Sequence, residues 1–227
     1  MQGKKQNISM QKEFGQYDEK LVKIIEKSTE LFGEYGVRNL NMDEISKGIG
    51  ISKKTLYQFV CSKEDLLEKI FHYEEEKWQQ LPSKIKEDEL NAIDVLLQTS
   101  LLIYEELRRI NPKVDFELKK YYKPVFNKFL SRRLDSIFFY ISNNLKKGMG
   151  EGLYRNDLNV ELIARVYVKN LVDLQNKDYC SIEDFSFEQV FKTVFENHIR
   201  AISSPEGIAY FEKRKLEFSE LKHLNNK

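Results

Sequence analysis

The segment spanning residues 40–66 constrains the fold of this chain most, because it encodes two short helices and a sharp turn between them. Ile45 and Ile49 share one face of the first helix, and Asn41 stands before it as a candidate N-cap. Gly50 tolerates a positive φ, which a chain needs to leave one helix and start another within a few residues. The segment therefore predicts a helix-turn-helix unit.

The second helix of this unit begins after Ser52, whose hydroxyl can cap it. Its apolar residues Ile51, Leu56 and Val60 can pack inward. The residues left to point elsewhere are Lys53, Lys54, Thr55, Tyr57 and Phe59. In a helix-turn-helix unit the second helix enters the major groove of DNA, where its first residues meet base edges and nearby cations hold phosphates. The pattern therefore indicates DNA binding.

A third helix begins near Lys63, with Ser62 as its candidate cap. A cation beside the free N–H groups of a first helical turn suits a phosphate. The helix dipole otherwise disfavours a lysine there, although Glu64 and Asp65 can offset its charge. Taken singly, such features are more often plain connectors or solvated side chains, and only their order and spacing favour DNA contact.

These residues resemble the N-terminal signature of the TetR-like (TetR/AcrR) bacterial transcriptional regulators. The residues that match in register are Ile45-Ser46, Gly50-Ile51-Ser52, Thr55-Leu56-Tyr57 and Lys63-Glu64-Asp65-Leu66. The resemblance covers residues 18–70, because the apolar spacing before the motif fits the family's first helix. It implies a three-helix DNA-binding head whose DNA-facing residues are Ser52, Lys53, Lys54, Thr55, Tyr57 and Lys63, with Asn41 as a further phosphate or capping group.

The rest of the chain also has the periodicity of helices, since no alternating run bounded by turns indicates a strand. Helical patterns end near Pro82, Pro112, Pro124 and residues 148–152. We predict an all-α fold with a polar leader (residues 1–17), a helix-turn-helix DNA-binding domain (18–68) and a larger helical domain for effector binding and dimerisation (69–227).

The charge balance excludes binding to nucleic acid through an overall positive field. Lys and Arg number 37 and Asp and Glu number 36, so the net charge is only +1 and DNA binding must rely on a local patch. The leader lacks the apolar core of a signal peptide, and no stretch is apolar enough to span a membrane. Because Cys61 and Cys180 are isolated, we expect a reducing, cytoplasmic location and no membrane partner.

Motifs of enzyme active sites are missing from the sequence. The three histidines, His72, His198 and His223, are scattered and have no companions at metal-ligand spacing. There is no phosphate-cradling glycine loop and no nucleophile elbow. We therefore expect no enzymatic activity, no metal and no cofactor.

Two helical patterns in the last third of the chain have unusually broad apolar faces. One side can pack on the subunit's own core and the other on a second copy, as the TetR-like resemblance also implies; a wholly intramolecular core is the alternative. Candidate interface residues are Val160, Ile163, Tyr167, Leu171, Phe191, Val194, Phe195, His198 and Ile202. In a homodimer, two heads one helical turn apart would read a palindromic operator in double-stranded DNA.

Aromatic residues gather around Pro112 and Pro124. Rings with a few hydroxyls suit an apolar, partly polar small molecule, although such residues are more often ordinary core. The candidate ligand-binding residues are Tyr104, Phe116, Tyr121, Tyr122, Phe126, Phe129 and Phe138. We expect a homodimeric regulator, a repressor on the strength of the resemblance alone, released from DNA by an effector that the sequence does not identify. The alternative is an effector-independent dimeric helix-turn-helix factor that organises DNA or binds proteins.

The salt dependence of DNA binding tests the assigned lysine roles. If each head of a dimer uses three phosphate-binding lysines, about six charges are neutralised and the slope of log affinity against log salt is roughly −5. Titrating a DNA duplex with the protein at several salt concentrations measures this slope. A slope close to zero would contradict the assignment.

Overall fold

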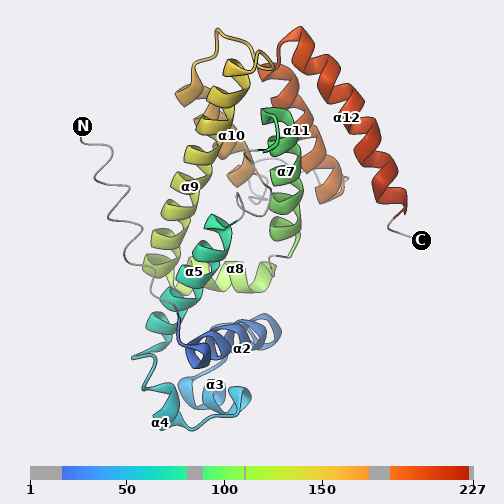
Figure 1. Cartoon of the computed structure of the whole chain (residues 1–227). Helices are drawn as coiled ribbons and strands as arrows, with labels where there is room; N and C mark the ends of the chain where they lie inside the picture. Colours follow the sequence, from blue (N-terminus) through green and yellow to red (C-terminus); the bar gives the residue numbers. More distant parts are fainter. Residues whose placement is uncertain (1–16, 81–88, 110, 174–184, 225–227) are drawn as a thin grey trace, which may run out of the picture. The chain divides into compact units, whose positions relative to one another are not determined.

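A computed structural model of the chain describes residues 17–80, 89–109, 111–173 and 185–224. The predicted leader up to residue 16 and Cys180 lie outside this range. The helices are α2 (Glu19–Tyr35), α3 (Met42–Ile49), α4 (Lys53–Leu56), α5 (Lys63–Gln79), α7 (Ala92–Arg108), α8 (Pro112–Tyr121), α9 (Lys123–Gly150), α10 (Val160–Asp173), α11 (Phe187–Ile202) and α12 (Pro205–Leu224) (Figure 1). The described residues contain no strand, so the predicted all-α fold is confirmed. None of the described helices is long and apolar enough to cross a membrane.

The chain divides into two compact units. The first contains the described residues up to Glu74 and also Asn111–Asn127, and the second contains Glu75–Ile110 and the residues from Lys128 onward. Helices α5 and α9 therefore contribute residues to both units. This division differs from a boundary at residues 68 and 69, because α8 joins the first unit; the functional limits of the domains stay a prediction.

The first unit is built around the three helices α2, α3 and α4 and the start of α5 (Figure 1). Helices α3 and α4, with 8 and 4 residues, are too short to be stable alone in water, so a shared apolar core must hold the unit together. The buried residues of this core are Ile24, Ile25, Phe32, Val37, Ile45, Leu56, Val60, Leu66, Leu67 and Ile70. The predicted three-helix head is confirmed.

The helix α4 is a single regular turn and is shorter than its apolar pattern suggests. Beyond Leu56 the chain continues in turns, in which the Tyr57 N–H donates to the Lys53 carbonyl (3.0 Å) and the Val60 N–H donates to the Leu56 carbonyl (3.1 Å). Leu56 and Val60 are both buried, as predicted. The turns therefore keep the apolar residues inward while the first residues of α4 stay exposed.

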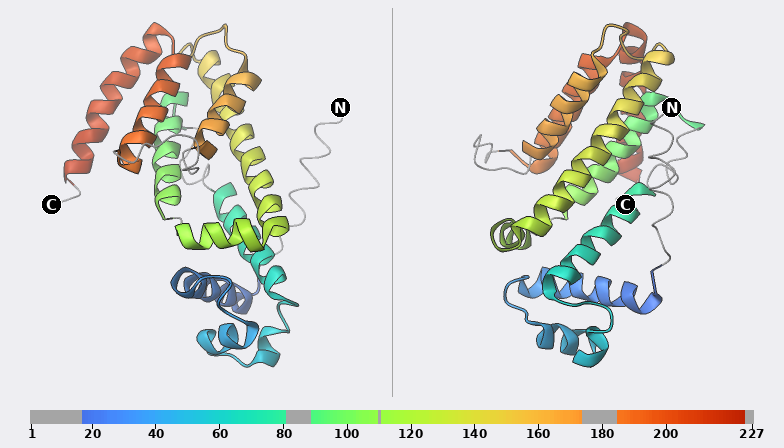
Figure 2. Two further views of the ribbon diagram at one scale, coloured as in Figure 1. Left: turned by 180° about the vertical axis from the view of Figure 1, so that it is seen from behind. Right: turned by 90° about the vertical axis from the view of Figure 1, so that its left-hand side faces the viewer.

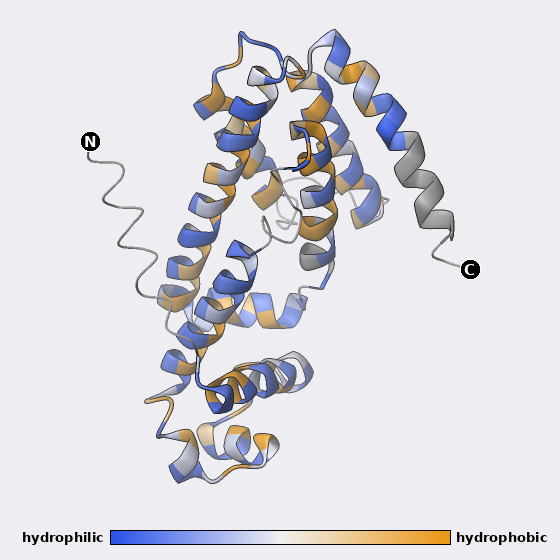
Figure 3. Ribbon diagram, in the orientation of Figure 1, coloured by the Kyte–Doolittle hydropathy of each residue, from blue (hydrophilic) through white to orange (hydrophobic). Residues whose placement is uncertain are grey.

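The second unit is a bundle in which α7, α9, α10 and α11 run alongside one another (Figure 2). Hydrophobic and hydrophilic residues are interleaved along α9 and α11, as expected of amphipathic helices (Figure 3). The core includes Ile93, Leu96, Ile103, Ile141, Leu145, Tyr167, Leu171, Phe191, Phe195, Ile199, Ile202 and Phe211. Every long helix of this unit thus buries one face in a common core.

A buried carboxylate fastens α12 to the start of α7. Asp94 is 5% exposed and accepts hydrogen bonds from the Tyr210 hydroxyl (2.5 Å) and from Nε of Arg214 (2.7 Å). Burial and the hydrogen bond to Asp94 raise the pKa of Tyr210, which keeps its hydroxyl protonated as a donor. A buried charge is tolerated only when it is paired in this way, so the contact fixes where α12 lies on the bundle.

His198 of α11 is half-buried, and its Nε2 atom is buried without a hydrogen-bond partner. Its ring stacks on Tyr167 of α10, with ring centroids 3.8 Å apart and planes 17° from parallel. Burial lowers the pKa of His198 from 6.5 to about 4, because a charged imidazolium would lose its hydration there. The histidine is therefore neutral in the folded chain at neutral pH.

The neutral His198 makes stability depend on acid. Its folded pKa of about 4 lies below the unfolded value, so its contribution is complete above about pH 6.5 and is lost as the pH falls toward 4. The loss amounts to about 3 kcal/mol. Urea unfolding at about pH 7 and about pH 4.5 should show a larger drop in the free energy of unfolding for the wild type than for His198→Phe, which retains a ring on Tyr167. Equal drops would show that His198 does not titrate on unfolding.

Candidate nucleic-acid interface

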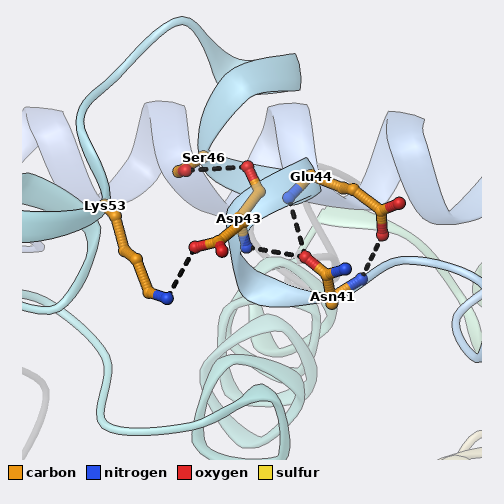
Figure 4. A network of polar contacts seen from close by, with 5 residues as sticks. All are labelled: Asn41, Asp43, Glu44, Ser46 and Lys53. Atoms are coloured by element: carbon orange, nitrogen blue, oxygen red, sulfur yellow. Dashed lines mark hydrogen bonds and ion pairs between the residues drawn. The ribbon is translucent and has the colours of Figure 1, made fainter.

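The start of α3 is held by a reciprocal pair of caps (Figure 4). Oδ1 of Asn41 accepts from the N–H groups of Asp43 (2.9 Å) and Glu44 (3.0 Å), and Oε2 of Glu44 accepts from the Asn41 N–H (2.7 Å). These bonds satisfy N–H groups that a helix leaves unpaired at its first turn. The predicted capping role of Asn41 is confirmed, while its contact with a phosphate stays a prediction.

Gly50 turns the chain between α3 and α4. Its φ of 83° and ψ of 32° lie in the left-handed region, and its N–H donates to the carbonyls of Ser46 (3.1 Å) and Lys47 (3.0 Å). Oγ of Ser52 then accepts from the Thr55 N–H (3.0 Å), which caps α4. The turn and its cap are thus those that the sequence predicted, and they fix α4 firmly against α3.

The predicted DNA-facing residues are mostly at the surface. Ser52, Lys53 and Lys54 are exposed and Thr55 is half-buried. Tyr57 is 43% exposed although it belongs to an aromatic residue type that usually packs inward. A hydroxyl, two ammonium groups and a phenol therefore border one another on and just after α4, which is the chemistry that phosphates and base edges accept.

One of these lysines has a partner that the sequence did not suggest. Nζ of Lys53 lies 2.7 Å from Oδ1 of Asp43 on α3 (Figure 4). The same Nζ is 6.0 Å from the centre of the Tyr57 ring. The hydrogen bond to Asp43 raises the pKa of Lys53, so the ammonium stays charged.

Lys63 makes its contacts within the first unit. Its Nζ donates to the carbonyl of Val37 (2.9 Å) and lies 5.7 Å from the centre of the Tyr122 ring. The predicted cap of α5 is present, since the Asp65 N–H donates to Oγ of Ser62 (3.1 Å). A phosphate contact by Lys63 stays a prediction.

Helix α8 grips the loop between α2 and α3. Glu117 is 8% exposed, and its Oε2 accepts from the Arg38 N–H (2.9 Å). Gly36 allows the loop to come this close, because a Cβ at this position would lie 2.9 Å from Oε1 of Glu117. The φ of Gly36 is 88°, a conformation that also favours glycine. Beside it, the Arg38 guanidinium donates to the Tyr121 hydroxyl (3.1 Å) and lies over the Tyr121 ring.

Two further side chains of α8 and its cap reach carbonyls at the end of α2. Nδ2 of Asn111 donates to the Gly33 carbonyl (2.9 Å), and Nζ of Lys113 donates to the Tyr35 carbonyl (3.2 Å). Asn111 also accepts from the N–H of Lys113 (3.0 Å), which caps α8 itself. Sequence patterns do not predict these contacts, because the partners lie 78 residues apart and belong to no local pattern.

Removing the Glu117 carboxylate should loosen the loop that precedes α3. Glu117→Ala leaves the Arg38 N–H without its acceptor, which costs about 1–3 kcal/mol locally. Hydrogen exchange of the Arg38 amide should therefore accelerate by about tenfold or more. Glu117→Gln is the matched control, since its amide oxygen can still accept this bond and should preserve slow exchange. Fast exchange in both variants would mean that the charge, not the acceptor, holds the loop.

The predicted ligand-binding aromatics have several different partners. The Tyr104 ring stacks on Phe187, with centroids 5.7 Å apart, whereas Phe126 contacts Phe71 at 6.5 Å. Phe116 is 57% exposed, which is unlike the lining of an apolar pocket. The first unit holds Phe116, Tyr121, Tyr122 and Phe126, and the second holds Tyr104, Phe129 and Phe138. Their role in binding a ligand stays a prediction.

Most of the predicted dimer-interface residues pack inside the single chain. Five of them lie in its core: Tyr167, Leu171, Phe191, Phe195 and Ile202. Val160, Ile163 and Val194 pack partly against that core, and His198 stacks on Tyr167. The apolar residues that α10 leaves exposed are instead Leu162 (57%) and Val166 (49%), which the periodicity did not single out. The interface stays a prediction.

The head of this chain matches a known family of sequences. The sequence model of the family described as "Bacterial regulatory proteins, tetR family" matches residues 24–70, which span most of α2, all of α3 and α4 and the first half of α5. The chain is a TetR-like DNA-binding transcriptional regulator. The resemblance inferred from residues 18–70 is thereby confirmed, and a regulator rather than an enzyme is what the comparisons support.

Relatives of this TetR-like chain match it along most of its length. The "Uncharacterized HTH-type transcriptional regulator YvaF" of Bacillus subtilis is 22% identical over 172 residues, which cover 74% of this chain and 88% of that protein. A transcriptional regulator from Cytophaga hutchinsonii has a similar structure, with a TM-score of 0.69, 22% identity and coverage of 82% and 100% of the two chains. The ketosteroid transcriptional regulator KstR2 of Mycobacterium tuberculosis has a TM-score of 0.54 and 19% identity, with coverage of 84% and 98%. At these identities the two structures support the fold.

Proposed function

We propose that this TetR-like protein is a homodimeric repressor that binds a palindromic operator and is released from it by a small-molecule effector. The observation that carries the proposal is the capped pair α3 and α4, which presents Ser52, Lys53, Lys54 and Tyr57 at the surface. A group that reads DNA must be held in place before the DNA arrives, and the caps and the Gly50 turn hold this one. Which genes it regulates follows from the operator sequence.

A second copy is needed because one head covers too few base pairs for a regulator to find its site. Leu162 and Val166 are four residues apart on α10, so their exposed side chains share one face of the helix. Single exposed apolar residues are common, but two neighbours on one face favour contact with another protein surface. We assign them to the contact between the two copies.

Effector control is supported by the chemistry of the larger unit and by a relative. Tyr104 lies against Phe187 and Phe191, with ring centroids 5.7 and 5.5 Å apart, so this unit offers aromatic surface to an apolar molecule. The relative KstR2 is named for ketosteroids, which are apolar molecules with a few polar atoms. For this chain we propose an effector of that general chemistry, without assigning a particular one.

The effector acts by favouring one shape of the protein over another. Helices α5 and α9 contain residues of both units, so a change in the larger unit can reach the first unit through their backbones. Within the first unit, α8 holds the loop before α3 by a hydrogen bond from the Arg38 N–H to Glu117. Only an effector with different affinities for the two shapes moves the population away from the one that binds DNA.

Selection of bound duplexes from a random DNA library tests this function. Wild-type protein should enrich a palindromic site, and Lys54→Ala or Tyr57→Phe should weaken binding to that site by about five- to fiftyfold, as expected when one or two DNA contacts per head are lost. Lys23→Ala on α2 is the matched control, because it removes the same charge from an exposed lysine outside the α3–α4 pair. Its affinity should stay within about twofold of wild type.

Other outcomes of the same selection decide between functions. Failure to enrich any palindrome would contradict the proposed regulator. Enrichment by wild type but not by Leu162→Glu, whose charge opposes contact between copies, would support the dimer. A site whose affinity no apolar small molecule changes would favour the effector-independent factor that organises DNA or binds proteins.

A further inference from the structure

Asp43 places a negative charge within the proposed DNA-binding surface. Its carboxylate is 2.7 Å from the ammonium of Lys53, and the two side chains are 52% and 56% exposed (Figure 4). Asp43 belongs to α3 and Lys53 begins α4, so the pair bridges the two helices of the reading unit. A carboxylate beside DNA repels phosphates and so weakens DNA binding. Its position here therefore calls for an explanation, either in the stability of the head or in its function.

Stability does not explain the pair. An ion pair this exposed contributes little to folding, because water and salt screen it and two long side chains lose freedom. The head already has its caps at Asn41 and Ser52 and its buried core. The pair is therefore best understood by what it does to the ammonium of Lys53.

The backbone that carries Asp43 is fixed before DNA binds. It is held from two sides, since the Asp43 N–H donates to Oδ1 of Asn41 (2.9 Å) and the Asp43 carbonyl accepts from Oγ of Ser46 (2.9 Å). The centre of the Tyr57 ring is 6.0 Å from the Lys53 ammonium. The lysine is thus tethered at a defined place on the surface, and a phosphate must compete with a carboxylate to draw it away.

We propose that Asp43 sets the specificity of DNA binding by tethering Lys53. Non-specific binding depends on phosphate contacts, so a lysine whose charge is already matched contributes less to it. Specific binding needs groups at fixed places opposite base edges, and a tethered ammonium meets that need. Asp43 therefore weakens binding to arbitrary DNA more than binding to the operator. The inference rests on the proposed sequence-specific function.

Removal of the carboxylate tests this role in the full-length protein. Fluorescence anisotropy would measure the affinity of wild type and Asp43→Asn for a random-sequence duplex and for the selected operator, at several salt concentrations. Asp43→Asn should tighten binding to the random duplex by about three- to tenfold and steepen its salt slope by about 1–2, since a dimer gains one free lysine in each head. Operator affinity should rise less than about twofold, because the gain in attraction is offset by the loss of a positioned Lys53. The ratio of the two affinities should therefore fall.

Two further variants separate tethering from a simple change of charge. Glu30→Gln removes the same charge from an exposed acid of the same unit, on α2 and away from the lysines assigned to DNA, and should change the affinity for the random duplex by less than half as much on a logarithmic scale. In a Lys53→Gln background, Asp43→Asn should lose most of its effect, because no lysine is left to release. Thermal unfolding of each variant checks that the head is folded.

Several results would overturn the role of Asp43. These are an unchanged random-duplex affinity in Asp43→Asn, an equal effect of Glu30→Gln, and an undiminished effect of Asp43→Asn without Lys53. If the wild type selects no operator, the proposed regulator fails, yet the random-duplex measurements still decide whether Asp43 restrains Lys53. If an operator is selected and Asp43→Asn leaves the affinity ratio intact, the specificity role alone is wrong.

Discussion

Helices as short as α3 and α4 do not persist in water by themselves, so the whole DNA-binding surface depends on the hydrogen bonds that close their first turns. The Asn41–Glu44 pair closes α3, and Ser52 closes α4. Between them, Gly50 supplies the only backbone geometry that joins the two helices in so few residues. Every exposed group assigned to DNA is carried on this frame, so its precision is set by backbone contacts and not by the lysines themselves.

The frame does not stand alone, because helix α8 completes it from a distant part of the chain. Glu117 receives the N–H of Arg38, and neighbouring side chains of α8 reach the end of α2. The loop leading into α3 and the helix α8 that holds it therefore belong to the same compact unit as α3. Burial of a carboxylate is unfavourable unless the group accepts hydrogen bonds, so the buried Glu117 opposes rearrangement of the chain at this point.

Local features of the head could be read from the sequence because each is encoded within a few residues. Asn41 and Ser52 accept from N–H groups close along the chain, and Gly50 turns the backbone through its left-handed conformation. The apolar spacing of α2 marks its buried face. Side-chain pairing could not be read in the same way. The sequence showed Lys53 and Lys63 as cations but not that Asp43 and the Val37 carbonyl are their partners, since those contacts depend on how the helices pack.

The same limit applies to the larger unit. Periodicity indicates the apolar faces of α10 and α11 but not what covers them, so it cannot distinguish a core within one chain, where Tyr167 and Phe195 are buried, from a contact with a second copy. Exposure, unlike hydrophobicity, is not a property of a residue type, so the sequence alone does not mark Leu162 and Val166 as exposed.

Because α8 belongs to the same unit as the head, the head cannot be transferred to another protein as one continuous segment. A head transplanted onto another regulator by a junction after α4 would arrive without Glu117, Asn111 and Lys113, and three hydrogen bonds to backbone groups around α2 would be lost. The exchangeable module is therefore discontinuous: it consists of the first seventy or so residues together with Asn111–Asn127. In descent as in engineering, a replacement head must therefore bring its own α8 residues with it.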